Sequence, residues 1–247
     1  MTVRIAMWSG PRNISTAMMR AFENRDDTVV SDEPFYAAYL AATGLDHPMR
    51  AEVLASQPTD WRDVAAAVTG PVPGGKPVWY QKHMCHHMID GFGLDWSDAC
   101  INAFLIRDPA AVLASYVRKR SDVTLGEIGV VRQAEIFDRV AQRTGTAPPV
   151  IETADVLAEP RGMLTALCAA LGVDFSERML SWPAGPRASD GVWAPAWYDV
   201  VEQSTGFAPP SPAAPAPALP DDLRAIADAA QPYYDNMARW RLAAARA

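Results

Sequence analysis

Three cationic side chains each follow a short apolar run, and these are the residues of the chain best suited to bind an anion. Arg12 follows the run at residues 3–8, Arg107 follows the run at residues 101–106, and Lys82 follows a third such run. Arg presents a planar fork of N–H donors that suits phosphate or sulfonate oxygens, and Lys supplies a compact positive charge. We therefore expect chemistry on a phosphorylated or sulfonated compound.

The first segment predicts a strand, a tight loop and a helix. Residues 3–8 are short and apolar with a β-branched start, which is typical of a buried strand. Gly and Pro then break the strand, and Ser15 and Thr16 stand where a hydroxyl suits the start of a helix. Such a turn points backbone N–H groups and a positive dipole end at an anion, although it also resembles an ordinary βα turn. The predicted anion-binding loop consists of Gly10, Pro11, Arg12, Asn13, Ile14, Ser15 and Thr16.

The loop lacks the signature of a nucleoside-triphosphate site, G-x-x-x-x-G-K-[ST]. Counting from Gly10, Ser15 replaces the second Gly and Thr16 replaces the Lys. A phosphate-binding turn without that Lys and the hydroxyl that holds magnesium fits a magnesium-dependent kinase poorly.

Residues 101–115 form the second cationic segment, and they bring an arginine and a serine to the same end of a predicted strand. Residues 101–106 are the clearest buried strand of the chain, and Arg107 follows it directly. Asp108 and Pro109 are typical of the first turn of a helix, and Ser115 lies seven residues after Asp108 on the same helical face. We expect Arg107 and Ser115 to approach one ligand. An arginine ion pair and a solvent-facing serine are the competing interpretation.

Glu33, Lys82 and His83 are candidate functional residues at the ends of two further strands. Glu33 follows a β-branched strand at residues 28–31, while Lys82 and His83 follow the strand at residues 77–81. Ligands of open α/β sheets gather at the carboxyl ends of the strands, so these side chains would lie near the anion-binding loop. A solvated loop carboxylate is the alternative for Glu33.

Three of the four histidines lie close together at His83, His86 and His87, with Cys85 between them. A zinc site would need paired Cys-x-x-Cys spacing or the H-E-x-x-H order, and neither occurs here. We therefore predict no metal site, and structural roles for His86 and His87.

Strands and helices alternate along the chain, which predicts an α/β fold with a mostly parallel central sheet and helices on both faces. The predicted strands cover residues 3–8, 28–31, 77–81, 101–106 and 149–152. The predicted helices cover residues 15–22, 35–42, 49–56, 60–68, 109–120, 125–143, 163–171 and 221–246, the last kinked or divided at Pro232.

The C-terminal third departs from this alternation. Residues 182–198 combine three tryptophans with Pro and Gly around Arg187, which indicates a functional loop that could close over a nucleotide. Residues 208–220 are a Pro/Ala-rich surface linker, and residues 221–247 form a helical segment that packs back on the rest. We expect one domain over residues 1–247.

Composition excludes several classes of function. The 247 residues carry a net charge of −7, whereas a nucleic-acid surface needs clustered Lys and Arg. No window approaches the ~18 consecutive apolar residues of a membrane helix, and the N-terminus does not resemble a signal peptide. Three widely spaced cysteines suit a reducing compartment. We expect a cytoplasmic protein that binds neither nucleic acid nor membrane; the sequence does not indicate its oligomeric state.

Two motifs together resemble the sulfotransferase family that uses 3′-phosphoadenosine 5′-phosphosulfate (PAPS). The family's first motif is Pro-[Lys/Arg]-Ser-Gly-Thr-Thr after a strand, and residues 11–16 match it except at Asn13 and Ile14. The second is an apolar strand ending in Arg, an Asx-Pro turn and a Ser eight residues after the Arg, which Arg107 and Ser115 match. The resemblance extends, through WSGPRNIST, QKHM and DGVWAP, to a bacterial branch and to a plant domain fused to an aminotransferase-like domain.

The resemblance implies a P-loop NTPase-like, three-layer α/β/α fold and PAPS as a co-substrate without a metal. It implies that Arg12 and its loop hold the 5′-phosphosulfate and that Arg107 and Ser115 hold the 3′-phosphate. The segment around Arg187 is similar to the family's Arg-Lys-Gly nucleotide loop without reproducing it. The missing loop Gly removes the residue whose backbone is freest.

The same resemblance implies transfer of a sulfonyl group to a hydroxyl or amine of a small molecule. Lys82 would neutralise the sulfonate, and Glu33 or His83 would act as general base. Two other interpretations stay open: a P-loop small-molecule kinase, and a nucleotide-binding module without catalytic activity.

Overall fold

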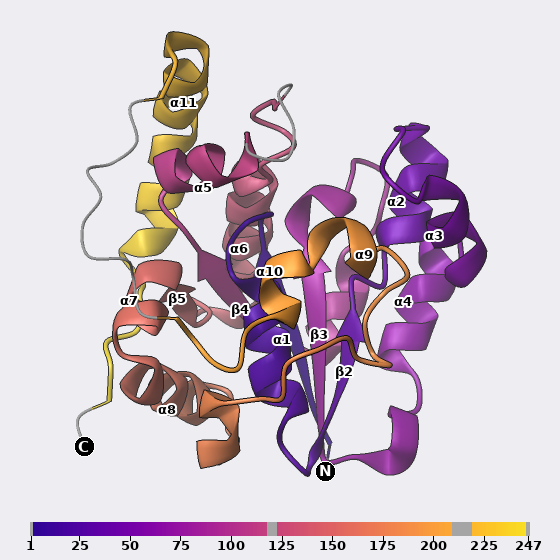
Figure 1. The fold of residues 1–247 in the computed structure, drawn as a ribbon, viewed down its shortest axis with the longest axis vertical. Coiled ribbons are helices and arrows are strands. Elements are labelled where there is room, and N and C mark those ends of the chain that lie inside the picture. The colour runs from indigo at the N-terminus through magenta and orange to yellow at the C-terminus, as the bar shows by residue number, and fades with distance from the viewer. Residues whose placement is uncertain (1, 118–122, 209–218, 246–247) are drawn as a thin grey trace.

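The computed structural model describes residues 2–117, 123–208 and 219–245, and its strands form a parallel sheet in the order β2-β3-β1-β4-β5 (Figure 1). All four pairings between neighbouring strands are parallel. The α/β class with a parallel central sheet is therefore confirmed. The strands are β1 Val3–Ser9, β2 Thr28–Asp32, β3 Val78–Met84, β4 Ile101–Ile106 and β5 Val150–Glu152.

Helices cover both faces of the sheet and give three layers. Alternate residues of β1 face opposite layers: Ala6 and Trp8 belong to one hydrophobic cluster, and Ile5 and Met7 to the other. The first cluster includes residues of α2, α4, α5, α6 and α11, and the second includes residues of α1, α7 and α8. Burial on both faces explains why these strands read as continuous apolar runs.

The longer helices are α1 Ser15–Glu23, α2 Tyr36–Thr43, α3 Arg50–Ser56, α4 Trp61–Thr69, α5 Pro109–Tyr116, α6 Val130–Thr144, α7 Thr153–Ala158, α8 Pro160–Ala170 and α11 Asp221–Ala238. Short helical turns are η1 Pro73–Gly75, η2 Cys85–His87, η3 Asp95–Ala99, η4 Glu177–Leu180, α9 Ala194–Trp197 and α10 Asp199–Glu202. Two predicted helix starts are confirmed by side-chain caps: Asp60 accepts from the backbone N–H of Arg62, and Asp108 accepts from that of Ala111.

Two helix predictions were wrong in their bounds. The helix predicted from residue 125 begins at Val130, because Gly129 takes φ 72° and residues before it form a turn in which Thr124 donates to the Glu127 carboxylate. The last helix, predicted to reach residue 246, ends at Ala238, and Pro232 does not divide it. The helix predicted to continue to residue 120 is described to Tyr116, and residues 118–122 lie outside the described part of the chain.

The third strand is longer than predicted, with a consequence for the site. β3 continues through Met84, so Lys82 and His83 lie within the strand and not after it. Consecutive residues of a strand point to opposite faces of a sheet. Lys82 pairs with Asp32 in the register of β2, while the ring of His83 lies 4.8 Å from that of Trp8 in the opposite layer.

Buried polar side chains hold the carboxyl edge of the sheet in place. The amide of Gln133 donates to the carbonyls of Trp8 and Leu105 at 3.1 and 2.9 Å. Asn13 donates to the same Leu105 carbonyl at 3.2 Å, and the Thr153 hydroxyl donates to the Ile106 carbonyl at 3.0 Å. These bonds satisfy backbone groups at strand ends that cannot reach water, and they fix the position of the loops that follow.

The C-terminal helix α11 packs against α5 and α6, as predicted for residues 221–247. Its buried residues Leu223, Ala227, Ala230 and Met237 join the cluster on that face of the sheet. After it, the N–H of Leu242 donates to the Val150 carbonyl at 2.8 Å on edge strand β5. Most of the predicted linker, residues 209–218, lies outside the described residues. In the part of the chain that the structure covers, no helix is both long and apolar enough to cross a membrane.

Candidate active site

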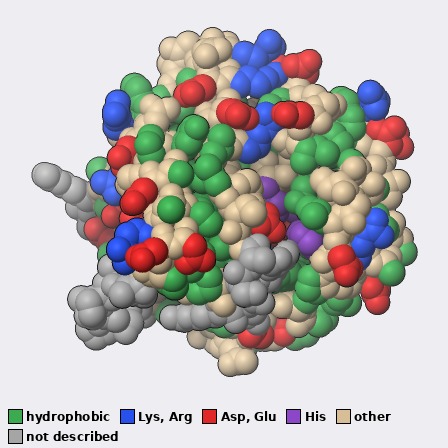
Figure 2. Space-filling model, turned by 90° about the horizontal axis from the view of Figure 1, so that it is seen from above, with side chains coloured by type: hydrophobic (Ala, Val, Ile, Leu, Met, Phe, Trp, Pro, Cys, Tyr) green, Lys and Arg blue, Asp and Glu red, His purple; other side chains and the backbone are tan. Residues whose placement is uncertain are grey.

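A cavity of about 650 Å³ opens at the carboxyl ends of the strands. Its lining comes from all five strands: residues 11–17 follow β1, Glu33 follows β2, Met84 ends β3, Arg107 follows β4 and Glu152 ends β5. Seen from above, histidine side chains lie in a hollow near the middle of this face (Figure 2). The wall is completed by the late segment, defined as residues 182–208, through Trp197, Tyr198, Val200, Val201, Ser204, Gly206, Phe207 and Ala208.

The loop after β1 has an unusual backbone. Arg12 and Ile14 have positive φ angles of 64° and 53°, and Glu33 across the cavity has φ 40°. Residues with a Cβ rarely adopt this left-handed region, and such strain clusters where a site requires a particular geometry. The loop therefore turns without a Gly at this position, because Ile14 itself takes the left-handed conformation.

The start of α1 faces the cavity. Within the described residues no side chain caps this helix at Ile14, and its first turn has no acidic residue. The first N–H groups of a helix have no partner inside the helix, and the helix dipole adds positive potential there. Ser15, Thr16 and Ala17 of this turn all line the cavity, so an anion placed there would meet backbone donors.

The two cationic segments lie against each other. Arg12 Nε donates to Ser115 Oγ at 3.0 Å, and Arg107 Nη1 donates to the backbone carbonyl of Arg12 at 2.6 Å. All three residues line the cavity. One ligand of nucleotide size can therefore touch the loop after β1, the end of β4 and helix α5 together.

Lys82 reaches the same cavity from β3 and is almost fully buried. Its Nζ lies 3.1 Å from Thr16 Oγ1, 2.9 Å from Asp32 Oδ1, 2.8 Å from Glu33 Oε1 and 2.6 Å from the Tyr198 hydroxyl. Its side chain is only 1% exposed, so the two carboxylates offset the cost of burying its charge.

This cluster shifts the acid–base properties of its members. Burial opposes the charge of Lys82, but Asp32 and Glu33 outweigh burial and raise the pKa of the ammonium well above its usual value. Burial raises the pKa of Glu33 and Asp32 adds to this, while Lys82 acts in the opposite direction. Lys82 is thus a fixed positive charge, and Glu33 is a stronger base than an exposed carboxylate.

Neutral aromatic rings lie near Glu33. The ring of His87 stacks on Tyr36 at 4.7 Å, and its Nε2 lies 3.9 Å from Glu33 Oε2. Tyr36 and His47 are 2.9 Å apart between the phenol oxygen and Nδ1. Burial lowers the pKa of His86 to about 3 and that of His87 well below its usual value, so both imidazoles are uncharged near neutral pH.

His83 and Arg187 do not line the cavity. His83 is 2% exposed, its Nε2 lies 3.1 Å from Gln81 Oε1, and burial lowers its pKa to about 3. Arg187 Nη2 donates to the Pro183 carbonyl at 2.9 Å. Gly10 is also outside the lining, and a Cβ there would come within 2.4 Å of the Ile128 carbonyl oxygen, so its role is to allow close packing under the loop.

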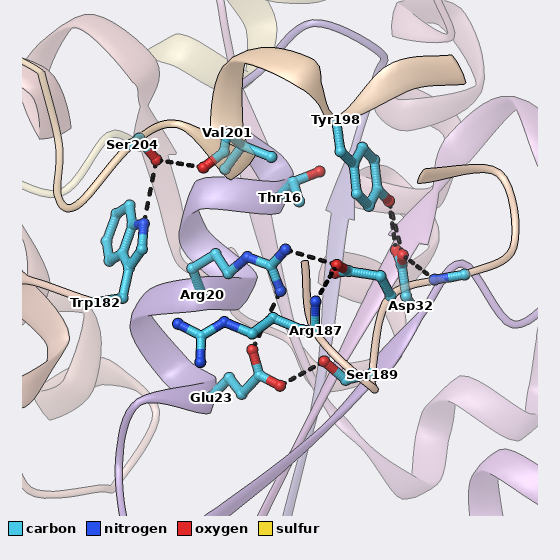
Figure 3. Close-up of polar contacts among 12 residues, drawn as sticks. Thr16, Arg20, Glu23, Asp32, Trp182, Arg187, Ser189, Tyr198, Val201 and Ser204 are labelled. Carbon is cyan, nitrogen blue, oxygen red and sulfur yellow. Dashed lines mark hydrogen bonds and ion pairs between the residues drawn. The ribbon is translucent and has the colours of Figure 1, made fainter. Parts of the chain in front are cut away.

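The segment around Arg187 is fastened to α1 and β2 (Figure 3). The Asp190 carboxylate accepts from the backbone N–H of Arg187 and from the guanidinium of Arg20, both at 2.7 Å. Ser189 donates to Glu23, and the N–H of Gly191 donates to Asp32 at 3.0 Å. These contacts place residues 194–208 at the cavity, although the segment contains short helices that were not predicted.

Asp32, Tyr198 and Glu152 are members of the site that the sequence did not identify. Asp32 directly precedes Glu33 at the end of a strand, which is the signal that could have identified it. Tyr198 lies within the late segment, and only the tertiary fold brings its hydroxyl to Lys82. Glu152 ends β5 and pairs with Ile106, the residue that directly precedes Arg107.

The part of the chain that the structure describes holds no group of three His, Cys, Asp or Glu side chains placed to bind a metal ion. His83, one member of the histidine cluster noted in the sequence, faces the core, because it lies on the opposite face of β3 from Lys82.

The chain has relatives among solved structures. The sulfotransferase domain of the Synechococcus PCC 7002 olefin synthase superimposes with a TM-score of 0.54 at 20% identity, over 92% of this chain and 94% of that domain. The sulfotransferase domain from the curacin biosynthetic pathway gives a TM-score of 0.53 at 15% identity, over 94% and 98% of the two chains. At these identities the likeness establishes the fold.

Sequence comparison finds closer relatives in a plant. Over 206 residues, 83% of this chain, it is 35% identical to the branched-chain-amino-acid aminotransferase-like protein 2 of Arabidopsis thaliana and 38% identical to protein 1 of that name. The match spans only 36% and 37% of those proteins, so the chain corresponds to about a third of each. The family comparison matches residues 3–241 to the sulfotransferase domain. The chain therefore belongs to the sulfotransferase-domain family.

Proposed function

We propose that this protein transfers the sulfonyl group of PAPS to a hydroxyl, or an amine, of a small-molecule acceptor. The observation that carries the proposal is the contact of Arg12 with Ser115 and of Arg107 with the Arg12 carbonyl, at 3.0 and 2.6 Å. PAPS carries anionic groups at both its 3′ and 5′ positions. A site for it needs two sets of anion donors within one nucleotide's reach, and these residues provide them beside the start of α1.

The order of the strands supports a direction for the donor. Arg107 follows β4 and Glu33 follows the edge strand β2, with β1 and β3 between them, so the two residues line different ends of the cavity. We assign the nucleotide to the end beside Arg107, with its 3′-phosphate on Arg107 and Ser115. The acceptor then occupies the end beside Glu33, where Tyr36 and the uncharged imidazoles offer apolar surface.

Sulfonyl transfer moves sulfur from the donor's phosphate oxygen to the oxygen of the acceptor. The acceptor oxygen attacks sulfur as the bond from sulfur to the phosphate oxygen breaks, and Glu33 takes the proton of the acceptor. Arg12 and the N–H groups of the loop stabilise the negative charge that develops on the departing 5′-phosphate. Lys82 offsets the negative charge of the sulfonate while it moves from the donor to the acceptor. Most of the rate gain comes from holding these groups in line.

Of the two candidate bases, the geometry favours Glu33. Its carboxylate lines the cavity, while His83 faces the core and its pKa is too low for it to accept a proton near neutral pH. Three unpaired cysteines fit a protein that works in the reducing cytoplasm.

Calorimetric titration tests the proposal. We expect 3′-phosphoadenosine 5′-phosphate (PAP) to bind much more tightly than ATP with magnesium, and acceptors to be sulfonated when PAPS is supplied. Preferential binding of ATP with magnesium would favour a kinase and overturn the proposal. Tight PAP binding without turnover over a broad acceptor panel would instead favour a module without catalytic activity.

A further inference from the structure

The ammonium of Lys82 has more hydrogen-bond acceptors than protons. An ammonium carries three N–H donors. Four oxygens lie within 3.1 Å of Lys82 Nζ, on Thr16, Asp32, Glu33 and Tyr198. At any moment one of the four oxygens lacks a proton from Lys82, so an incoming anion can gain a hydrogen bond only by displacing one of them.

The four acceptors differ in how firmly they are held. The Tyr198 hydroxyl donates to Asp32, whose two oxygens lie 2.9 and 2.7 Å away (Figure 3). It accepts from Trp193 Nε1 at 3.1 Å. Asp32 also accepts from the backbone N–H of Gly191. The side chains of Tyr198 and Asp32 are both nearly fully buried. Thr16 and Glu33, by contrast, face the cavity and can turn toward a ligand.

Tyr198 lines the cavity, yet its oxygen has no capacity left for a ligand. One proton points to Asp32, and the lone pairs face Trp193 and Lys82. The ring centroid also lies 4.8 Å from Lys82 Nζ, which adds an attraction between the cation and the ring. The residue is thus arranged to hold Lys82 and not to bind substrate.

We propose that Tyr198, together with Asp32, is a positioning residue for Lys82 that holds the ammonium at the cavity wall while the contacts of Lys82 with Thr16 and Glu33 are exchanged for an oxygen of the transferring sulfonate. This inference rests on the proposed function. It has a mechanistic consequence, because the exchange removes the cation from Glu33. The carboxylate becomes free to accept a proton when the donor is in place.

A pair of matched variants isolates this role. Tyr198→Phe keeps the ring and removes the hydroxyl. Tyr80→Phe is the control: Tyr80 is a buried phenol on the same strand as Lys82, its ring stacks on Phe22, and its hydroxyl has no hydrogen-bond partner among the described residues. Trp193→Phe removes one N–H donor to the Tyr198 oxygen and serves as a milder second variant if Tyr198→Phe does not fold.

The sequence allows a direct view of the ammonium, because it contains only three lysines, Lys76, Lys82 and Lys119. Nitrogen-15 labelling of lysine gives at most three ammonium signals, and Lys76→Arg with Lys119→Arg leaves that of Lys82. We expect a slowly exchanging Lys82 signal in wild type and Tyr80→Phe. In Tyr198→Phe we expect proton exchange with water to be at least about tenfold faster, and in Trp193→Phe a smaller change in the same direction.

Kinetics and binding separate this proposal from the proposed function. For Tyr198→Phe we expect kcat to fall about tenfold while the KM for PAPS and the Kd for PAP stay within about twofold of wild type. A folded Tyr198→Phe or Trp193→Phe protein whose Lys82 signal and kcat equal those of Tyr80→Phe would overturn the positioning role alone. A wild-type protein that does not bind PAP would overturn the proposed function itself.

Discussion

Arg12 Nε and Ser115 Oγ lie 3.0 Å apart although 103 residues separate them in the chain. The contact joins the loop after β1 to helix α5, and Arg107 adds a second link through the Arg12 carbonyl. Anion donors from two distant segments therefore form one continuous surface. This relationship makes binding of a doubly anionic nucleotide testable residue by residue.

The first prediction concerns the 3′-phosphate. Arg107→Ala should weaken PAP binding by about 30-fold or more, because a charge-assisted pair of hydrogen bonds is lost. Binding of adenosine 5′-phosphosulfate, which lacks the 3′-phosphate, should change less than about threefold. Calorimetry with both nucleotides measures the difference, and equal losses would remove Arg107 from this role.

The second prediction concerns the base. Glu33→Gln keeps the size of the side chain and its contact with Lys82 but cannot take a proton, so kcat should fall by about a hundredfold or more with PAP affinity nearly unchanged. Because burial raises the pKa of Glu33, wild-type kcat should rise with pH through a value above that of an exposed Glu. His83→Gln is the matched comparison. If His83→Gln lost activity and Glu33→Gln kept it, the assignment of the base would be reversed.

The third prediction concerns Glu152 and pH. Burial is the main cause that raises the pKa of this carboxyl to about 7, while the Tyr234 hydroxyl, which donates to it at 3.0 Å, acts in the opposite direction. Glu152 lines the same cavity as Arg107, so its negative charge opposes binding of a phosphate. Below pH 7 the carboxyl is protonated, and PAP should bind more tightly at pH 6 than at pH 8.

Glu152→Gln is the control for this effect, because the nucleotide's own phosphate also takes up protons in this range. The variant should bind PAP with a weaker dependence on pH than wild type, and with higher affinity at pH 8. Identical pH dependence in the two proteins, measured by calorimetry, would show that Glu152 does not contribute.

The fourth prediction concerns the late segment. A Cβ at Gly191 would lie 2.1 Å from the indole of Trp193, which is closer than atoms can approach. Gly191→Ala should therefore displace Trp193 and the nearby Tyr198, and lower both the melting temperature and kcat. Gly126→Ala, where the nearest atom to the new Cβ is Thr124 Oγ1 at 3.9 Å, should leave melting temperature nearly unchanged. A Gly191→Ala protein as stable and active as wild type would contradict the fold of this segment.

The sequence predicted the sheet, and the meeting of Arg107 and Ser115 at one end of the cavity, because both depend on local signals. The apolar runs that precede Arg12 and Arg107 mark buried strands of a parallel sheet, and the carboxyl ends of such strands meet at one edge. Asp108 is a helix cap in the sequence and in the structure. Spacing along the helix it starts placed Ser115 on the correct face.

The other end of the cavity was less predictable, because it depends on tertiary contacts and on the face of a strand. His83 and Lys82 are adjacent in sequence, and only the true end of β3 decides that one faces the core and the other the cavity. Tyr198 and Arg187 belong to the same irregular segment, where no periodicity of apolar residues indicates which side chains point to the cavity. The contact of Asp190 with Arg20 turns that segment so that Tyr198, and not Arg187, lines the cavity.

Because consecutive side chains of β3 point to opposite faces of the sheet, the protein is sensitive to an insertion within this strand. One extra residue ahead of Gln81 would rotate every later side chain of the strand to the reverse side. Gln81 would then take the position of the ammonium beside Asp32, and Lys82 would take the position of His83 among Trp8 and Trp96, without any counterion. A single inserted residue in β3 would thus disrupt both the core packing and the site. At the loop tip around Gly74, a new Cβ would meet no neighbouring atom within 4 Å, so an insertion there would be accommodated.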